Sequence, residues 1–199
     1  MTKSLINKLF EQKIFPIIRN QDTKSAVEIA KAYVKGGVDI IEVNIENPSL
    51  FEAIKEISQF ATVCAGGVIT TLQAQTAIDA GAKILSSPIM SMNLVKFSKA
   101  KKIPFIAGAS TANEAYEAGK SRIQLIKLYP ISAMGGAKYV ENLLRPMPFL
   151  SVMPQGDVKI EEITQYIKAG AKVVGIGRDL YDGYTSDEIT TRTKKALEV

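Results

Sequence analysis

The chain has 199 residues, of which 25 are Lys or Arg, 20 are Asp or Glu, one is Cys and none is His. The absence of histidine excludes a Ser-His-Asp triad, a Cys-His pair and a histidine-ligated zinc, so a general base must be a carboxylate, a lysine, a tyrosine or the substrate. One cysteine excludes an intrachain disulfide, and nothing in the sequence indicates secretion. The first residues are interrupted by Lys3, Asn7 and Lys8, unlike a signal peptide.

No apolar run approaches the roughly 20 residues of a membrane span, so we expect a cytoplasmic protein without a membrane partner. The net charge of +5 comes from lysines spread along the chain, which is typical of a solvated surface. We therefore expect no nucleic-acid partner either.

Short apolar runs rich in β-forming residues alternate with segments of helical periodicity from end to end. The predicted strands are 14–19, 39–45, 62–67, 83–88, 104–109, 124–130, 149–155 and 172–177. Predicted helices between them include 25–34, 49–59, 72–80 and 111–118. Two helix starts carry a local signal: Asn47-Pro48 is a cap followed by proline at the first helical position, and Thr111 with Glu114 forms a capping box. The alternation predicts parallel strands with right-handed crossovers.

A glycine ends several predicted helices just before the next strand. Gly36-Gly37, Gly81 and Gly170 have this position, and Gly119 is a looser copy. The recurrence favours a closed (β/α)8 TIM barrel over an open sheet. We expect one domain over residues 1–199, with an extra N-terminal helix over 1–12 covering the N-terminal end of the barrel.

One lysine falls inside the predicted barrel. In the sixth strand Ile126 and Leu128 are the natural outward pair, so Lys127 points inward near the C-terminal ends of the strands, where barrel enzymes hold their active sites. Burial there favours the neutral, nucleophilic amine that Schiff-base catalysis on a carbonyl requires. The alternative is a lysine that simply pairs with a carboxylate.

A carboxylate shares that interior. Alternation in the second strand turns Glu42 and Asn44 inward, so Glu42 faces the same space as Lys127. Glu42 could carry protons through water, or it could only neutralise Lys127. The two interpretations are compatible.

These motifs, in this order, resemble the 2-keto-3-deoxy-6-phosphogluconate/2-keto-4-hydroxyglutarate aldolases, a family of class I aldolases with a compact barrel. The resemblance covers nearly the whole chain. It rests on the following colinear segments: Phe15-Pro16-Ile17-Ile18-Arg19, Gly36-Gly37 through Glu42-Val43, Ala65-Gly66-Gly67-Val68, Ser87-Pro88, Ile106-Ala107-Gly108-Ala109-Ser110-Thr111 with Glu114, and Lys127-Leu128-Tyr129-Pro130 followed by Gly135-Gly136.

The resemblance implies a role for four residues. Lys127 would form the imine with the keto carbon of a keto-acid substrate, and Glu42 would be the general acid/base. Tyr129 would pack over the imine, and Pro88 would line the pocket. The implied reaction releases pyruvate and an aldehyde without a metal or a cofactor, and the implied assembly is a homotrimer.

The groups expected to hold the substrate carboxylate differ from the family pattern. Where that pattern reads EVTLRT, this chain has Glu46 in place of the arginine, so Arg19 at the end of the first strand is the candidate cation. Gly67 stands where the family usually has threonine, which removes a hydroxyl from the same region.

The glycine turns after the seventh and eighth strands differ as well. Such turns can cradle a phosphate with their backbone N–H groups. The family reads PTGG at the first turn, and this chain reads Pro154-Gln155-Gly156-Asp157; the second turn reads Gly177-Arg178. Asp157 would repel a phosphate and Arg178 would attract one, so the two side chains either pair with each other or leave Arg178 to the substrate.

We therefore predict a class I aldolase that cleaves a 2-keto-3-deoxy (phospho)sugar acid or 2-keto-4-hydroxyglutarate. Two alternatives stay open. One is another barrel enzyme acting on a sugar phosphate, which the Lys127-Leu128-Tyr129-Pro130 motif disfavours. The other is a family member that has lost or altered its catalysis and binds a ligand, because a fold alone does not establish a function.

Overall fold

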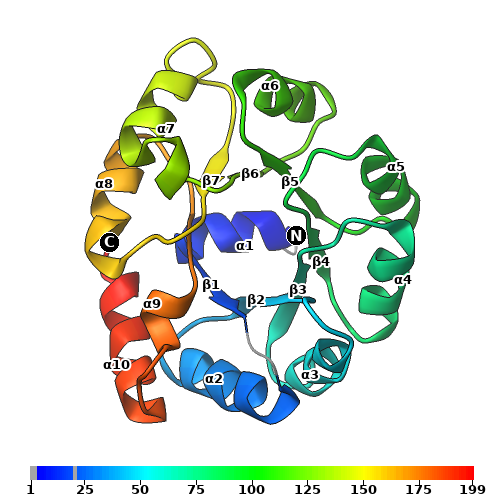
Figure 1. Cartoon of the computed structure of the whole chain (residues 1–199), viewed down its shortest axis with the longest axis vertical. Helices are drawn as coiled ribbons and strands as arrows, with labels where there is room; N and C mark the ends of the chain where they lie inside the picture. The colour runs from blue at the N-terminus through cyan, green and yellow to red at the C-terminus, as the bar shows by residue number, and fades with distance from the viewer. Residues whose placement is uncertain (1–3, 20–21) are drawn as a thin grey trace.

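The computed structural model describes residues 4–19 and 22–199. Its eight strands are parallel and follow one another around a barrel in the order β7-β6-β5-β4-β3-β2-β1-β8 (Figure 1). They are β1 Ile14–Ile18, β2 Ile40–Asn44, β3 Thr62–Gly66, β4 Ile84–Ser86, β5 Phe105–Ala109, β6 Ile126–Leu128, β7 Val152–Pro154 and β8 Val174–Ile176. A bridge between Gln155 and Gly175 joins β7 to β8. The predicted (β/α)8 TIM barrel is thus confirmed.

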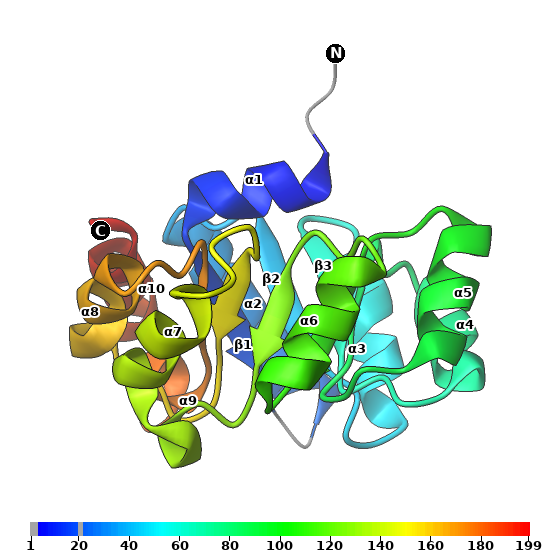
Figure 2. The same ribbon diagram turned by 90° about the horizontal axis from the view of Figure 1, so that it is seen from above.

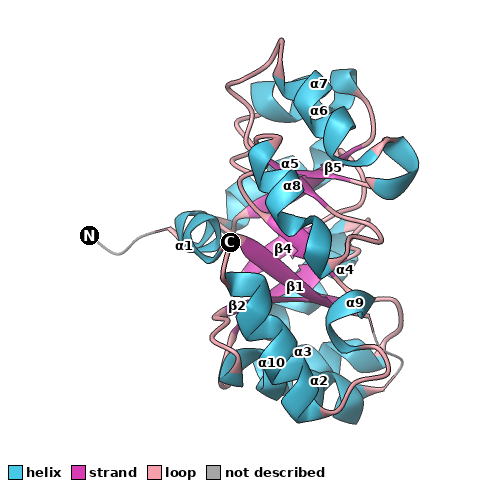
Figure 3. Ribbon diagram, turned by 90° about the vertical axis from the view of Figure 1, so that its left-hand side faces the viewer, coloured by secondary structure: helices cyan, strands magenta, loops and turns pink. Residues whose placement is uncertain are grey.

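Helices surround the strands as an outer ring (Figures 1 and 3). They are α2 Thr23–Lys35, α3 Ser49–Ile57, α4 Thr71–Asp79, α5 Met92–Lys101, α6 Ala112–Lys120, α7 Gly136–Leu144, α8 Ile163–Lys168, α9 Arg178–Tyr181 and α10 Ser186–Leu197, with short 3-10 turns at Ser132–Met134 and Ile160–Glu162. No helix in residues 4–19 and 22–199 is long and apolar enough to cross a bilayer.

The alternation of side chains along the strands separates two apolar cores. Outward residues such as Ile41, Val43, Ile126 and Leu128 pack in a large core beneath the helices. Inward residues make a second, smaller core that fills one end of the barrel. Its buried members are Ile6, Leu9, Phe15, Ile40, Cys64, Ile84, Ile106, Leu125, Met153 and Val173.

An extra helix, α1 (Leu5–Gln12), closes the N-terminal end of the barrel. Figure 2 shows it lying across that end, with α9 at the opposite end. The Ser4 side chain caps α1, and the helix buries Ile6 and Leu9 in the inner core while its other side meets solvent. This placement confirms the expected N-terminal helix; Met1 to Lys3 lie outside the described residues. With this end filled, the barrel is open for binding at the C-terminal ends of its strands.

Most of the predicted turn signals are confirmed. Gly37, Gly81 and Gly170 adopt φ angles of 103°, 111° and 104°, the left-handed region that glycine enters without strain. The prediction for Gly119 is wrong, because the left-handed residue at that helix end is Arg122, with φ 60°. Gly119 remains inside α6, where a Cβ would come within 2.6 Å of Leu150 Cδ2, so it serves close packing instead.

The two helix-start signals act as expected, with one shift of boundary. Thr111 and Glu114 form the capping box of α6. At α3 the regular helix begins at Ser49, where the predicted range begins, and Pro48 has the cap position and not the first helical position. Asn47 lies just before this cap, and its Oδ1 still accepts a hydrogen bond from Ser49 N at 3.0 Å.

Candidate active site

Lys127 lies in the middle of β6 with its side chain inside the barrel. It is 1% exposed, and its Nζ donates a hydrogen bond to Ser86 Oγ at 2.9 Å. The same Nζ is 4.0 Å from Glu42 Oε1. The predicted inward orientation is therefore correct, and the two interpretations of this lysine coexist: Lys127 is paired with a carboxylate, and it is held where an imine could form.

Glu42 lies on β2, across the interior from Lys127, and is fully buried. Its Oε1 faces Lys127, while its Oε2 is buried without a hydrogen-bond partner in the structure. Gly66 on β3 lies against this carboxylate, because a Cβ at position 66 would come within 2.5 Å of Glu42 Cδ. The sheet thus gives the carboxylate its space only because residue 66 has no side chain.

Gln155 directly follows β7 and is the third group at this point. It is 2% exposed, and its Nε2 donates to Glu42 Oε1 at 3.4 Å. Its Oε1 is buried with no partner. The amide orientation follows from Glu42, because the swapped amide would bring two acceptor oxygens together.

A cavity of about 710 Å³ opens at the C-terminal ends of β1, β6, β7 and β8. Among the predicted site residues, its lining includes Arg19, Tyr129, Gln155, Gly156, Gly177 and Arg178. Lys127 and Glu42 are not part of this lining; they are linked to it through Gln155. The pair of Lys127 and Glu42 therefore lies beneath the floor of the cavity.

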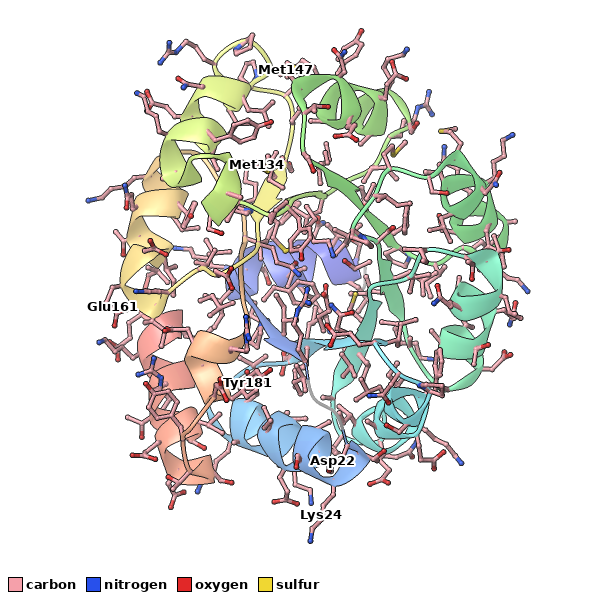
Figure 4. All side chains as sticks on the ribbon, in the orientation of Figure 1. Asp22, Lys24, Met134, Met147, Glu161 and Tyr181 are labelled. Carbon is pink, nitrogen blue, oxygen red and sulfur yellow. The ribbon has the colours of Figure 1, made fainter. Side chains whose placement is uncertain are left out.

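Arg19 stands at one side of the cavity, and its charge is paired. Its Nη1 is 2.8 Å from Glu46 Oε1, and its guanidinium carbon is 6.0 Å from the centroid of the Tyr129 ring. The backbone of Arg19 is fixed by Tyr181 of α9, labelled in Figure 4, whose hydroxyl donates to Arg19 O at 2.6 Å. Burial raises the pKa of Tyr181, so this hydroxyl stays a donor through the neutral range.

Arg178 stands at the start of α9 on another side of the cavity. Its Nη2 is 3.5 Å from Asp157 Oδ1, which realises the expected pair between these two side chains. Both side chains are largely exposed, at 67% and 75%. Asp157 sits directly on the glycine turn, where Gly156 and Asp157 have φ angles of 114° and 51°.

Besides Lys127 and Glu42, two more predicted site residues, Gly67 and Pro88, lie outside the lining of the cavity. The space where a Cβ of Gly67 would project is filled by the Asn44 side chain, whose Oδ1 contacts that position. Pro88 packs against Gly108, the residue that is in register with Lys127 on the neighbouring strand. Pro88 therefore lies near the strand that neighbours Lys127, and its backbone, not its ring, makes the contact.

Sequence reasoning missed Ser86, which holds Lys127. The signal was present, because Ile84 lies in the inner core and alternation turns Ser86 to the same side. Within residues 4–19 and 22–199, no group of three or more Cys, Asp and Glu side chains could hold a metal ion.

A parallel barrel with a lysine–carboxylate pair at the catalytic end of its strands defines a class of barrel proteins suited to carbonyl chemistry. Comparison with known proteins specifies the family. The profile described as "Aldolase: KDPG and KHG aldolase" matches residues 5–195, so the chain belongs to the KDPG and KHG aldolase family.

Individual relatives agree with that family. The chain is 28% identical over 177 residues to the 2-dehydro-3-deoxy-phosphogluconate aldolase of Treponema pallidum, covering 87% of this chain and 84% of the relative. It is 29% identical over 194 residues to the KHG/KDPG aldolase of Escherichia coli, covering 93% and 91%. Among solved structures, the Legionella pneumophila KDPG aldolase, with pyruvate captured as a covalent carbinolamine intermediate, has a TM-score of 0.88 at 22% identity and covers 96% and 97%.

Proposed function

We propose that Lys127 is the Schiff-base residue of an aldolase and that Glu42 is its general acid/base. The substrate class is a 2-keto-3-deoxy sugar acid, with or without phosphate, or 2-keto-4-hydroxyglutarate; the products are pyruvate and an aldehyde. The observation that carries the proposal is the geometry of Lys127 Nζ. It lies inside the barrel of a KDPG and KHG aldolase family member, 2.9 Å from Ser86 Oγ and 4.0 Å from Glu42 Oε1.

The reaction begins with bond formation at the amine. Lys127 first gives a proton to Glu42, and its neutral Nζ attacks the keto carbon. Glu42 returns that proton as the carbinolamine loses water to give an iminium. The iminium withdraws electrons from the bond between C3 and C4 of the substrate. Glu42 takes the proton of the C4 hydroxyl through a water molecule, the bond breaks, and the aldehyde leaves.

The second half returns the enzyme to its starting state. Glu42 returns a proton to C3 of the lysine-bound enamine, which becomes the iminium of pyruvate. Water adds to this iminium, pyruvate leaves, and Lys127 is regenerated. One carboxylate thus carries one proton in each direction, which fits a chain without histidine.

Burial assists both halves. In an interior with few water dipoles, the attraction between Lys127 and Glu42 is stronger than at the surface, and each group fixes the position of the other. Ser86 holds the Nζ from β4, so the amine is oriented before a substrate enters. In the Legionella aldolase pyruvate was captured as a carbinolamine; the proposal assigns the same covalent step to Lys127.

The test is trapping of the imine with pyruvate and sodium borohydride, followed by peptide mass mapping. We expect the added mass on the peptide that contains Lys127 and none in a Lys127→Met variant. Lys138→Met is the matched control, because Lys138 is exposed and pairs with Glu141 at the surface. Absence of the label at saturating pyruvate would support the ligand-binding alternative and refute the aldolase.

We also propose that the chain acts as a homotrimer. Several large apolar side chains are exposed on the segments that follow β3 and β4, namely Ile69, Leu72, Ile89 and Met92, with Leu72 76% exposed. Large apolar side chains exposed on neighbouring segments of a protomer support burial between subunits. Sedimentation analysis should give three times the monomer mass, and Leu72→Lys should reduce it; a monomeric wild-type chain would refute the proposal.

The cytoplasmic location and the single domain over residues 1–199 remain predictions. Cys64 is buried and unpaired, as is usual for proteins of reducing compartments. Fractionation of the host cell would test the location, and limited proteolysis would test the domain.

A further inference from the structure

The cavity above the catalytic pair has an unusual charge balance for a site that receives a phosphate. The described residues that line it include three cations, Arg19, Lys159 and Arg178. They also include four carboxylates, Glu46, Asp157, Asp179 and Asp182, which leaves a net charge of −1. A phosphate monoester, which carries nearly two negative charges, would therefore meet a lining without an excess of positive charge.

The two arginines are already paired. Arg19 is 2.8 Å from Glu46, and Arg178 is 3.5 Å from Asp157. An anion could use either guanidinium only by competing with a carboxylate that is tethered beside it. Asp157 is the stronger obstacle, because it belongs to the same turn as Gly156, where a phosphate would need backbone N–H groups.

A backbone donor near this turn is also occupied. The N–H of Ile160 donates to Asp179 Oδ2 at 3.0 Å, and the same oxygen is 3.2 Å from Arg192 Nη2. Asp179 is thus held on this side of the cavity by Arg192, which offsets its charge, and it occupies the N–H of Ile160. The N–H of Ile160 is therefore not free for a bound phosphate.

At the floor of the cavity, two hydrogen-bond acceptors have no donor in the structure. Gln155 Oε1 and Glu42 Oε2 are both buried acceptors without a partner, and Gln155 lies on the cavity lining. Buried acceptors normally have donors, so a bound molecule that supplies them is favoured. Hydroxyl groups can donate to both oxygens, whereas a phosphate or an ionised carboxylate offers acceptors to them.

We infer that the aldehyde half of the substrate is a neutral, hydroxylated chain without a phosphate or a carboxylate. This inference rests on the proposed aldolase function and specifies its substrate. The hydroxyl on C4, which becomes the aldehyde carbon, gives its proton to Glu42 through water. A second hydroxyl, further along the chain, donates to Gln155 Oε1. Gln155 is therefore a specificity-determining residue as well as a neighbour of Glu42.

The first experiment compares aldehydes in the condensation direction at saturating pyruvate. We expect kcat/KM for glyceraldehyde to be about tenfold higher than for glyceraldehyde 3-phosphate or glyoxylate, which represent the phosphorylated and carboxylated tails. This order is the reverse of what a phosphate site would give. A kcat/KM for either anionic aldehyde equal to or above that for glyceraldehyde would overturn the inference.

Two variants test the cause. Asp157→Asn removes the carboxylate on the turn and frees Arg178. The kcat/KM for glyceraldehyde 3-phosphate, divided by that for glyceraldehyde, should therefore rise about tenfold. The matched control is Asp187→Asn, which changes the net charge equally but lies on α10 in a pair with Lys35, outside the cavity. If both variants shift the ratio equally, the charge of the whole protein, and not the cavity, sets the preference and the inference fails.

Gln155→Leu separates hydroxyl recognition from orientation of Glu42. The wild-type chain should have a higher kcat/KM for glyceraldehyde than for propanal, which lacks the hydroxyls. In the variant, the ratio of these two kcat/KM values should be at least tenfold smaller. A loss that is equal for both aldehydes would show that Gln155 only positions Glu42.

Borohydride trapping with pyruvate accompanies every assay. A chain that traps pyruvate on Lys127 but prefers the phosphorylated aldehyde refutes this inference and leaves the aldolase intact. A chain that does not trap pyruvate refutes the proposed function itself.

Discussion

The ion pair in the interior of the barrel is buried, whereas the ion pairs at the rim of the cavity are exposed. Lys127 and Glu42 are 2% and 0% exposed as side chains and lie 4.0 Å apart, while Arg178 and Asp157 are 67% and 75% exposed and lie 3.5 Å apart. The inner pair keeps the residues of the family motif, and the rim pairs contain the departures from it. Distance alone therefore does not distinguish the interior pair from a surface pair; burial and the surrounding partners do.

The difference has a physical basis. At the rim, water and salt screen charges, and a side chain can change with little effect on stability. In the interior, each charge depends on its partner, because removal of one leaves the other buried and unpaired. One fold can therefore change the residues at the rim, which line the cavity, and keep the charged residues in the interior.

The largest expected effect concerns the interior. Glu42→Gln keeps the shape of the side chain but removes the proposed proton carrier, so kcat should fall about 1000-fold. Exchange of the pyruvate methyl protons with deuterated water, followed by NMR, should fall in parallel, because protonation of the enamine at C3 uses the same carboxylate. Retention of the wild-type exchange rate would assign the proton transfer to another group.

A smaller but still large effect is expected at Gly66. Gly66→Ala would place a Cβ against the Glu42 carboxylate, and displacement of about 1 Å at a catalytic group can cost about 100-fold in rate. The double variant with Glu42→Gln should be no slower than Glu42→Gln alone, because both changes act on one carboxylate. Additive losses would mean that Gly66→Ala damages the barrel by another route.

The rim pair should contribute little to stability. Arg178→Ala should lower the free energy of unfolding by less than about 1 kcal/mol, as is usual for exposed pairs. Urea unfolding of this variant and of Asp157→Ala would measure it, with the double variant completing the cycle. A coupling energy above about 2 kcal/mol would show that the rim is as tightly linked as a buried pair.

The smallest effect is a pH dependence at the cap of α6. Hydrogen bonds from Ser110 N and Thr111 lower the pKa of Glu114, so its contribution to stability is present above its unfolded pKa and is lost as pH falls through the lower folded value. Glu114→Gln should therefore destabilise the fold by about 0.5 kcal/mol at pH 7, a small value because the carboxylate is mostly exposed. The difference from wild type should vanish in acid, and a difference that persists at pH 2 would contradict this account.

Much of the fold was predictable because the spacing of the apolar residues and the glycine and capping signals at helix ends indicate the same elements. Apolar runs predicted all eight strands, and alternation placed Glu42 and Lys127 correctly inside the barrel. Gly119 was misinterpreted because a glycine near a helix end can serve either a left-handed turn or close packing. Here it serves close packing, because the Leu150 side chain lies against it. That contact joins segments 31 residues apart in the chain, so local pattern could not reveal it.

The site was less predictable than the fold. Alternation could have found Ser86, since it needs only the period of one strand. The contact between Gln155 and Glu42 joins residues 113 positions apart, on strands whose side chains meet across the barrel. Whether Pro88 reaches the cavity depends on how its loop packs against Gly108, which the sequence does not encode locally. Such contacts follow from closure of the barrel and not from any motif.

The single cysteine makes the barrel convenient for chemical labelling. Cys64 is fully buried in the inner core, and burial, with a smaller effect of Glu42, raises the pKa of its thiol well above the usual value. It is therefore a poor target for maleimide or iodoacetamide reagents while the protein is folded. A cysteine introduced in place of Tyr184, a 40% exposed residue at the cavity, could carry a fluorophore at one defined position without removal of the native thiol. The opening of the barrel is thus accessible to direct optical titration with aldehydes.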